Sequence, residues 1–269
     1  MAAKPIFGCV RAKPIKNMAG LVAMEKHGRR QDKSCQGRCD FSRSPDNLAW
    51  SCSLSGDPLD VVGAFKQRKT ATDAKEYGKA PVALHMLLTV SPEWIQDAGD
   101  MHDPKNPNNR KLFDQAKAWA EEKFGEGSVI ASRMDMDEAG GGVVDIFVVP
   151  VHQVKQRKTT KNQISINKAY EKAFGGGRVF GPMQDSWAEW CRTKIDPKIQ
   201  RGKTKAETGR EHVHSEVIAP ALKTLSKRQK AVSTREKQVT VREKQAAEVL
   251  TTPWFRSVPD ETKQRVLRQ

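Results

Sequence analysis

The stretch that most constrains the fold is residues 127–152, GSVIASRMDMDEAGGGVVDIFVVPVH. Two short runs of β-branched and apolar residues, 129–131 and 143–151, flank an acidic segment rich in glycine. Short apolar runs separated in this way predict two strands joined by a turn. Three consecutive glycines, 140–142, supply the backbone freedom that a tight reversal needs. We therefore expect a β-hairpin with an acidic tip.

Four carboxylates lie on or beside this hairpin: Asp135, Asp137, Glu138 and Asp145. Asp145 stands alone among the apolar residues of the second strand, where a carboxylate is costly unless it is paired or binds a metal. Carboxylates brought this close repel one another, and a divalent cation relieves the repulsion. The alternative is a solvated acidic tip, which leaves Asp145 unexplained.

The composition favours a polyanionic partner. The 269 residues carry a formal net charge of +15 and a pI of about 9.7, which favours nucleic acid first and an anionic membrane second. The length allows one large domain, or one domain with an appendage. No run approaches the roughly 20 apolar residues of a membrane span, and the N-terminus lacks a signal peptide's apolar stretch. We expect a soluble, cytoplasmic protein.

The five cysteines, an odd number, fit a reducing compartment. Cys35, Cys39 and Cys52 resemble part of a zinc site, but no fourth ligand has the right spacing. Ordinary reduced thiols are the favoured interpretation.

The first 126 residues predict alternating strands and helices. We expect strands at 6–10, 47–54 and 80–90, helices at 17–30, 59–70 and 111–124, and loops at 32–46 and 100–109.

Two histidines lie in this part of the chain. His27 has the cationic neighbours Lys26, Arg29 and Arg30, which we expect to lower its pKa and leave it neutral near pH 7. A neutral imidazole can act as a base, a ligand or a nucleophile. The alternative is a solvated histidine in a phosphate-binding patch. His85, within an apolar run, is expected to be a satisfied core histidine rather than a ligand.

Two basic segments follow the hairpin, and both are predicted to be loops that contact phosphates. Residues 152–168 contain no acidic residue and carry Lys155, Arg157, Lys158, Lys161 and Lys168. A helix begins at 168 and ends before the glycines at 175–177, and a second helix is expected at 181–195. The second basic segment carries Lys194, Lys198, Arg201, Lys203 and Lys205. The alternative role for this charge is surface solubility.

The C-terminal part predicts one long charged helix over residues 220–252, followed by a short tail at 253–269. A seven-residue repeat covers 235–248, but it has one clear apolar column: Leu225, Val232, Val239 and Ala246. A single helix and a weak dimer are both compatible with this pattern. Residues 1–219 are the predicted main domain.

Several stretches, taken in order, carry a family resemblance. EKHGRR at 25–30 resembles a Lys-His-Asn-x-Arg segment, and SRS at 42–44 with Asn47 resembles Ser-Arg-Ser-x-x-Asn. Further matches lie at 124–126, 137–138, 148–150, 164–165, 175–179, 184–189, 201–202 and 211–212. Over roughly residues 5 to 220 the chain is similar to the Mob/Pre (MobV-type) plasmid mobilisation relaxases.

The chain departs from that family at the metal site. The family pattern is His-x-Asp-Glu followed by Thr-Pro-His-x-His, whereas here Asp135 takes the first histidine position and Glu138 is kept. The later histidine positions fall on Val143 and Asp145. The resemblance therefore implies an all-oxygen site of Asp135, Glu138 and Asp145, which would prefer Mn²⁺ or Mg²⁺. A dead site that only binds DNA is the alternative.

The resemblance also implies a fold and a reaction. The fold would be α+β, an HUH-relaxase-like antiparallel sheet with helices on one side and the metal hairpin at its centre. The activity would be nicking of one DNA strand at an origin of transfer, with the protein left on the 5′ end. His27 matches the nucleophile position, Glu138 would assist, and neither Tyr77 nor Tyr170 matches one.

The implied partners are single-stranded or hairpin DNA at the origin, a coupling protein, and a second copy through the C-terminal helix. DNA contacts are expected from Arg29, Arg30, Arg43, Asn47 and His212, in addition to the two basic segments. An inactive DNA-binding protein and a rolling-circle replication initiator remain the alternatives.

Overall fold

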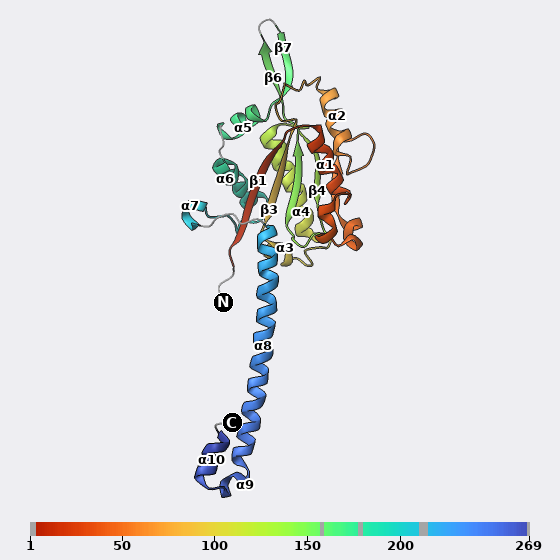
Figure 1. Cartoon of the computed structure of the whole chain (residues 1–269). Helices are drawn as coiled ribbons and strands as arrows, with labels where there is room; N and C mark the ends of the chain where they lie inside the picture. Colours follow the sequence, from red (N-terminus) through yellow and green to blue (C-terminus); the bar gives the residue numbers. More distant parts are fainter. Residues whose placement is uncertain (1–3, 157–158, 177–179, 210–214, 268–269) are drawn as a thin grey trace. The chain divides into compact units, whose positions relative to one another are not determined.

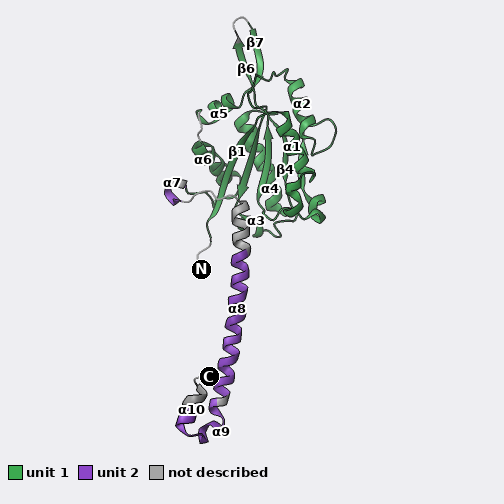
Figure 2. Ribbon diagram, in the orientation of Figure 1, with its two compact units in different colours: residues 1–203 green, residues 204–269 purple. Residues whose placement is uncertain are grey.

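The computed structural model describes residues 4–156, 159–176, 180–209 and 215–267 (Figure 1). The chain forms two compact units, residues 1–203 and 204–269 (Figure 2). Each unit is described by itself below.

The first unit is built on a six-stranded sheet with the strand order β2-β4-β5-β3-β1-β8. The strands are β1 (Ile6–Ile15), β2 (Leu48–Ser51), β3 (Ala83–Val90), β4 (Val129–Met134), β5 (Val143–Val148) and β8 (Ile199–Arg201). All neighbours run antiparallel except β1 and β8, which are parallel. The predicted hairpin is β4–β5, and Arg133 pairs with Asp145 across it. The predicted α+β fold is confirmed, with β5 between β4 and β3 in the interior of the sheet.

Helices cover both faces of this sheet, which corrects the expectation of helices on one side. Helices α4 (Pro107–Phe124), α5 (Ile166–Phe174) and α6 (Phe180–Trp190) pack on one face, and α1 (Met18–Gly28) and α2 (Val61–Ala71) pack on the other. Successive side chains of β5 point to opposite faces of the sheet, so the strand contributes to the apolar core under each helical layer. Val144, Ile146 and Val148 join the first core, whereas Phe147 joins the second.

Helix α1 brings His27 to the hairpin. Asn17 caps its start by accepting a hydrogen bond from the backbone N–H of Gly20 at 3.0 Å. The helix ends in a reversal at Arg30, whose φ is +58°, a left-handed conformation that costs a non-glycine residue about 1 kcal/mol or more. The N–H of Gln31 then bonds back to the carbonyl of Lys26 at 2.8 Å, which closes the turn.

The segments predicted as loops contain more regular structure than expected. Residues within 32–46 form two 3₁₀ turns, η1 (Lys33–Gly37) and η2 (Phe41–Asp46), and the short helix α3 (Pro92–Gln96) precedes the 100–109 segment. Helix α4 starts inside that segment because Asn106 caps it and Pro107 occupies its first turn. Helix α6 runs into a π-helical turn, η3 (Cys191–Ile195).

The first basic segment is a hairpin, not a loop. Strands β6 (Val151–Gln156) and β7 (Thr159–Ile164) form a separate two-stranded sheet that projects from the rest of the unit (Figure 1). Its base is tied down by Lys75, whose N–H donates to the carbonyl of Asn162 and whose carbonyl accepts from Ile164. Polar residues dominate the far end of this ribbon, whereas Ile164 at its base is buried.

The second unit is helical. It contains α7 (Lys205–Thr208), the long helix α8 (Ser215–Thr251), α9 (Pro253–Ser257) and α10 (Asp260–Leu267). Helix α8 starts at Ser215 rather than at the predicted Pro220, and the predicted tail folds into two short helices. In the described part of the chain, no helix has the length and apolar character that crossing a membrane requires.

Candidate functional site

A cleft of about 1320 Å³ opens on the sheet face beside α1. Its lining includes the predicted site residues His27, Asp135, Glu138 and Asp145, together with Asp32 and His85. Residues from α1, β3, β4, β5 and the segment after β4 therefore meet in one place. This cleft is the candidate functional site.

The His27 ring lies between two carboxylates. Its Nδ1 is 3.1 Å from Oδ2 of Asp32, and its Nε2 is 3.5 Å from Oε1 of Glu138. The interaction with Glu138 raises the pKa of His27 above its usual value; burial and the Arg133 charge oppose this, and Asp32 adds to it. The expectation of a lowered pKa is therefore wrong, because the carboxylates lie closer to the ring than the cationic neighbours in sequence.

Asp32 is a site residue that the sequence analysis missed. Its carboxylate accepts from Cys35 Sγ and Ser34 Oγ, both at 2.6 Å, as well as facing His27. These hydrogen bonds, that of Cys35 first, hold the pKa of Asp32 well below its usual range. The available signal was its position just beyond the end of the helix that carries His27.

Asp135 lies between two guanidinium groups. Its Oδ1 is 2.9 Å from Nη2 of Arg30 and 2.8 Å from Nε of Arg133. Burial raises the pKa of this carboxyl, and the Arg133 charge opposes the rise. Glu138 is more open, and the contact with His27 lowers its pKa.

Asp145 has partners within the protein. Its Oδ1 is 2.5 Å from Nε2 of His85, and its Oδ2 is 3.5 Å from Nη2 of Arg133. Burial alone would raise its pKa, but His85 and Arg133 outweigh burial and lower it. His85 in turn stacks on Phe147 with ring centroids 5.0 Å apart. The strand carboxylate is thus explained by pairing, without a metal.

Arg30 and Asn47, expected to contact DNA, instead fix the acidic tip. The Arg30 guanidinium is 5% exposed and binds both oxygens of Asp137, which is itself fully buried. Ser44 also donates to Asp137 at 2.6 Å, and the Asn47 side-chain oxygen accepts from the Met136 N–H at 2.7 Å. Arg30 and Asn47 thus hold the segment after β4 in place, with the Arg30 guanidinium buried and the Asn47 side chain half-buried.

The other predicted DNA contacts divide by exposure. Arg29 is engaged by Glu25 and Asp57, and Arg201 is paired with Asp185. The exposed cations are Arg43, Lys155, Lys161, Lys168, Lys194, Lys198 and Lys203. Arg157, Lys158 and His212 lie outside the described residues, and Lys205 lies in α7.

A rim of cations around the cleft was not anticipated. Five exposed basic residues line it: Arg11, Lys13, Lys16, Lys26 and Arg38. The first strand was predicted to end at Val10, but it continues to Ile15, so its polar half was overlooked. Alternation of basic and apolar residues from 11 to 15 was the signal that could have revealed it.

The cleft contains two candidate cation sites among the described residues. His27, Asp135 and Glu138 place one ligand atom each within 4.8 Å of one another, and so do His27, Asp32 and Cys35. The predicted set had Asp145 where the first group has His27. An imidazole with two carboxylates suits Mn²⁺, and the buried Oδ1 of Asp135 lacks a well-aligned hydrogen bond despite its two guanidinium neighbours. The first group therefore fits a divalent cation.

The charge around the cleft agrees with that fit. Four carboxylates line it: Asp32, Asp135, Glu138 and Asp145. Two guanidinium groups, those of Arg30 and Arg133, offset them only in part. Negative charge remains at the centre while the rim is positive.

Comparison with known proteins identifies the fold. No protein-family model and no curated protein matches the chain. The fold matches that of solved structures of the MobM relaxase domain (MOBV; Mob_Pre), in agreement with the fold that the sequence resemblance implied.

Two of the matching structures are the MobM relaxase domain in manganese-bound complexes with pMV158 oriT DNA of 22 nucleotides. The first, at pH 5.5, is 17% identical with a TM-score of 0.57 and covers 80% of this chain and 99% of that chain. The second, with a 3′ thiophosphate at pH 6.8, is 17% identical with a TM-score of 0.58 and covers 80% and 98%. At 17% identity, the similarity shows that the two folds are alike and does not by itself show a shared activity.

Proposed function

We propose that this protein is a relaxase: it binds single-stranded or hairpin DNA at an origin of transfer and nicks one strand by transesterification. The observation that carries the proposal is the His27 imidazole, held between Asp32 and Glu138 in a cleft with a cationic rim. The MobM domain that shares the fold is bound to oriT DNA. A DNA strand lying along this rim brings a phosphate to the ring.

In this mechanism His27 is the nucleophile, so the carboxylates of Asp135 and Glu138 are the members of the first candidate cation group that are left as ligands. Asp32 accepts a hydrogen bond from the Nδ1–H group, and Nε2, which faces Glu138, loses its proton to solvent before its lone pair attacks. Nε2 bonds to phosphorus, the bond from phosphorus to the 3′ oxygen breaks, and that oxygen takes a proton from water. The 5′ end stays on the protein as a phosphoramidate, and the Asp32 carboxylate offsets the positive charge that the ring acquires.

Asp135 and Glu138 would hold a divalent cation, Mn²⁺ or Mg²⁺, with Asp145 close enough to influence the charge of both. Such a cation, when bound, polarises a phosphoryl oxygen and stabilises transition-state charge. While Nε2 still carries its proton, Glu138 also orients the ring by its contact with that nitrogen. The exposed Arg11, Lys13 and Lys26 would neutralise flanking phosphates.

The test is formation of a covalent adduct. Purified protein is incubated with MnCl₂ and single-stranded oligonucleotides tiled over inverted repeats that flank its reading frame, and adducts are resolved on a denaturing gel. We expect an adduct with the wild type and with His102→Ala, a histidine outside the cleft lining, and none with His27→Ala. An adduct with His27→Ala would overturn the nucleophile assignment.

One observation favours a second candidate, an inactive relaxase-fold protein that only binds DNA. Arg30 and Arg133 already neutralise part of the charge on Asp135, and Asp145 is paired with His85. Calorimetric titration with MnCl₂ separates the two candidates. Heat of binding that Asp135→Ala removes supports the relaxase; the absence of binding to the wild type supports the DNA-binding protein. A replication initiator shares the chemistry and would differ in the origin that is nicked.

Further parts of the proposal concern partners and organisation. We place the activity in residues 1–219 and in the bacterial cytoplasm, where a coupling protein would receive the nucleoprotein. Exposed apolar residues at a heptad interval on α8, Leu225, Val232 and Val239, support weak self-association through that helix.

A further inference from the structure

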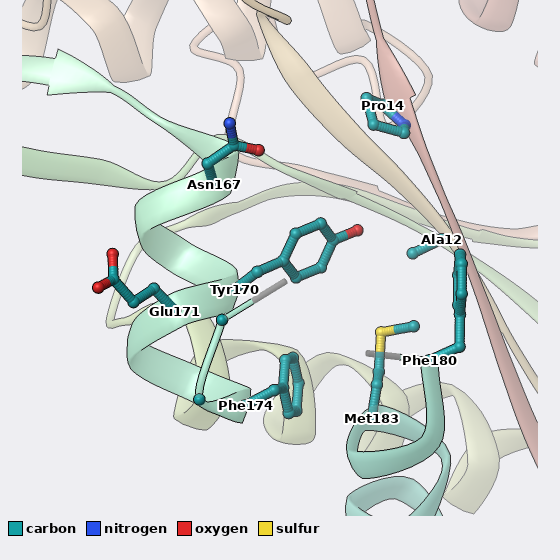
Figure 3. Close-up of a pocket in the computed structure, with 10 residues that line it drawn as sticks. Ala12, Pro14, Asn167, Tyr170, Glu171, Phe174, Phe180 and Met183 are labelled. Atoms are coloured by element: carbon teal, nitrogen blue, oxygen red, sulfur yellow. The ribbon is translucent and has the colours of Figure 1, made fainter. Parts of the chain in front are cut away.

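A second pocket, of about 960 Å³, lies between β1, α5 and α6 (Figure 3). The function proposed above does not use it. Its walls are mainly apolar and aromatic, and the six residues that matter most are Ala12, Pro14, Tyr170, Phe174, Phe180 and Met183. A pocket of this size and character is suited to a planar ligand group.

Two rings face the pocket from opposite sides. Tyr170 projects from α5 across the pocket with its hydroxyl toward β1, and Phe180 stands opposite it beside Ala12 (Figure 3). Phe180 is 55% exposed, which is unusual for phenylalanine, while Tyr170 is half-buried. Burial raises the pKa of Tyr170 to about 12, so its hydroxyl stays protonated and can donate a hydrogen bond.

The Tyr170 side of the pocket is rigid. Its ring packs on Phe124 at 6.3 Å and on Phe174 at 6.4 Å, and Phe174 stacks on the buried Trp119 at 6.2 Å. These rings belong to the core beneath α4 and α5. A ring fixed in this way can stack on a ligand with little further loss of side-chain freedom.

The pocket is continuous with the cleft. Ala12, Pro14 and Phe180 line both. Strand β8 pairs with β1 only as far as Gly8, so the later part of β1 is an edge of the sheet, with Arg11 and Lys13 exposed along it. A polyanion held at those two cations would pass over the edge from the cleft to the pocket.

We propose that this pocket receives one unstacked nucleobase of the DNA strand bound in the cleft, stacked against Tyr170 and Phe180. The proposal rests on the proposed function, because that function places the strand in the cleft. Every base offers a flat face to aromatic rings, and single-strand binding proteins use such rings at sites flanked by cations. Asn167 in the pocket wall and the Tyr170 hydroxyl can bond to the base edge.

The test compares two single strands of about 20 nucleotides, one of mixed sequence and one fully abasic. Binding is measured by fluorescence anisotropy in EDTA, so that no strand is cut. Phe180→Leu, at an exposed position, should raise Kd for the base-bearing strand roughly tenfold and leave Kd for the abasic strand unchanged. Tyr170→Leu should act in the same direction. The control is Tyr77→Leu, an aromatic residue 64% exposed outside the pocket, which should leave both Kd values unchanged.

A base analogue gives an independent readout. Stacking quenches 2-aminopurine, so wild-type protein should quench it at one or two positions of the strand, and Phe180→Leu should relieve that quenching. If the wild type binds the strand but both variants bind it equally well, the pocket is not a base site and the proposed function still stands. If the variants lose as much affinity for the abasic strand as for the base-bearing strand, the assignment of the pocket as a base site is also refuted. If the wild type binds neither strand, the proposed function fails first.

Discussion

The Nε2 atom of His27 lies 3.5 Å from Oε1 of Glu138, although the two residues are separated by more than 100 positions in the chain. This relationship joins the end of α1 to the segment after β4 and defines the centre of the cleft. Because Asp32 engages the opposite ring nitrogen, the imidazole is fixed at both ends.

Asp32 should matter for nicking more than for binding. In Asp32→Asn the ring loses the anion that fixes its tautomer and offsets its charge, so single-turnover nicking should slow on the order of 100-fold. Binding of single-stranded DNA should be unchanged. Asp40→Asn, an exposed carboxylate bonded to Ser42, is the matched control and should nick at the wild-type rate. Equal rates for Asp32→Asn and wild type would show that Asp32 has no part in the reaction.

Removal of the divalent cation should stop the nicking reaction. Carboxylates in the cleft exceed guanidinium groups, so a divalent ion adds to the stability of the site. We expect EDTA to abolish adduct formation and MnCl₂ to restore it. Adduct formation that continues after exhaustive chelation would contradict the assignment of Asp135 and Glu138 as ligands.

Arg30 should be essential for folding stability. Its guanidinium is buried against Asp137, and Arg30→Ala would leave that carboxylate buried without its charged partner. Removing one partner of a buried pair costs about 3–5 kcal/mol. Urea unfolding followed by circular dichroism should show a loss of this size. Arg43→Ala, whose exposed side chain lies 3.6 Å from Asp40, should cost about 0–1 kcal/mol. Similar losses for the two variants would disprove the structural role of Arg30.

Asp60 should make stability depend on pH in the acid range. It caps α2 by accepting from the Gly63 N–H at 2.7 Å, and it also accepts from Ser53 and Ser55. The Ser53 bond, partly offset by burial, and then the Gly63 and Ser55 bonds lower its pKa in the folded state. The unfolded chain therefore takes up the proton first as pH falls.

The charge on Asp60 thus stabilises the fold above the unfolded pKa of about 4 and is lost as pH falls through the folded value. Asp60→Asn keeps a capping oxygen but not the charge. Its unfolding free energy should be lower than that of wild type at pH 7 by about 1 kcal/mol, and the gap should narrow as pH falls below the unfolded pKa of about 4. A gap that is constant with pH would mean that the charge contributes nothing.

The β6–β7 hairpin should contribute to DNA affinity through phosphate contacts. Lys155 and Lys161 are exposed, and the register places them on opposite faces of the ribbon. Lys161→Ala and Lys155→Ala should each weaken binding. Each substitution that removes a phosphate contact should also lower the steepness of the salt dependence, the slope of −log Kd against log salt, by about one unit. Lys123→Ala, on α4, should leave both quantities unchanged. An effect from one lysine alone would show which face the DNA follows.

The sequence by itself determined the local elements and the chemical type of the site. Good helix formers indicated α1, apolar residues at helical spacing indicated α4, and two short β-branched runs around glycines indicated the β4–β5 hairpin. The family-like segments led to the relaxase fold, and His27, Asp135 and Glu138 do converge in one cleft. The basic segment after Val151 was misjudged as a loop because lysines and threonines alternate too weakly to indicate a two-faced ribbon.

Tertiary structure alone decided which charges meet. Nothing local indicated that Arg30 would be buried against Asp137 or that His85 would pair with Asp145. Each of these pairs joins residues from different parts of the chain, and the packing of the elements sets the distance between them. Electrostatic interactions depend on distances of a few ångströms. The pKa of His27 and the partner of each carboxylate therefore follow from the folded arrangement and not from neighbours in sequence.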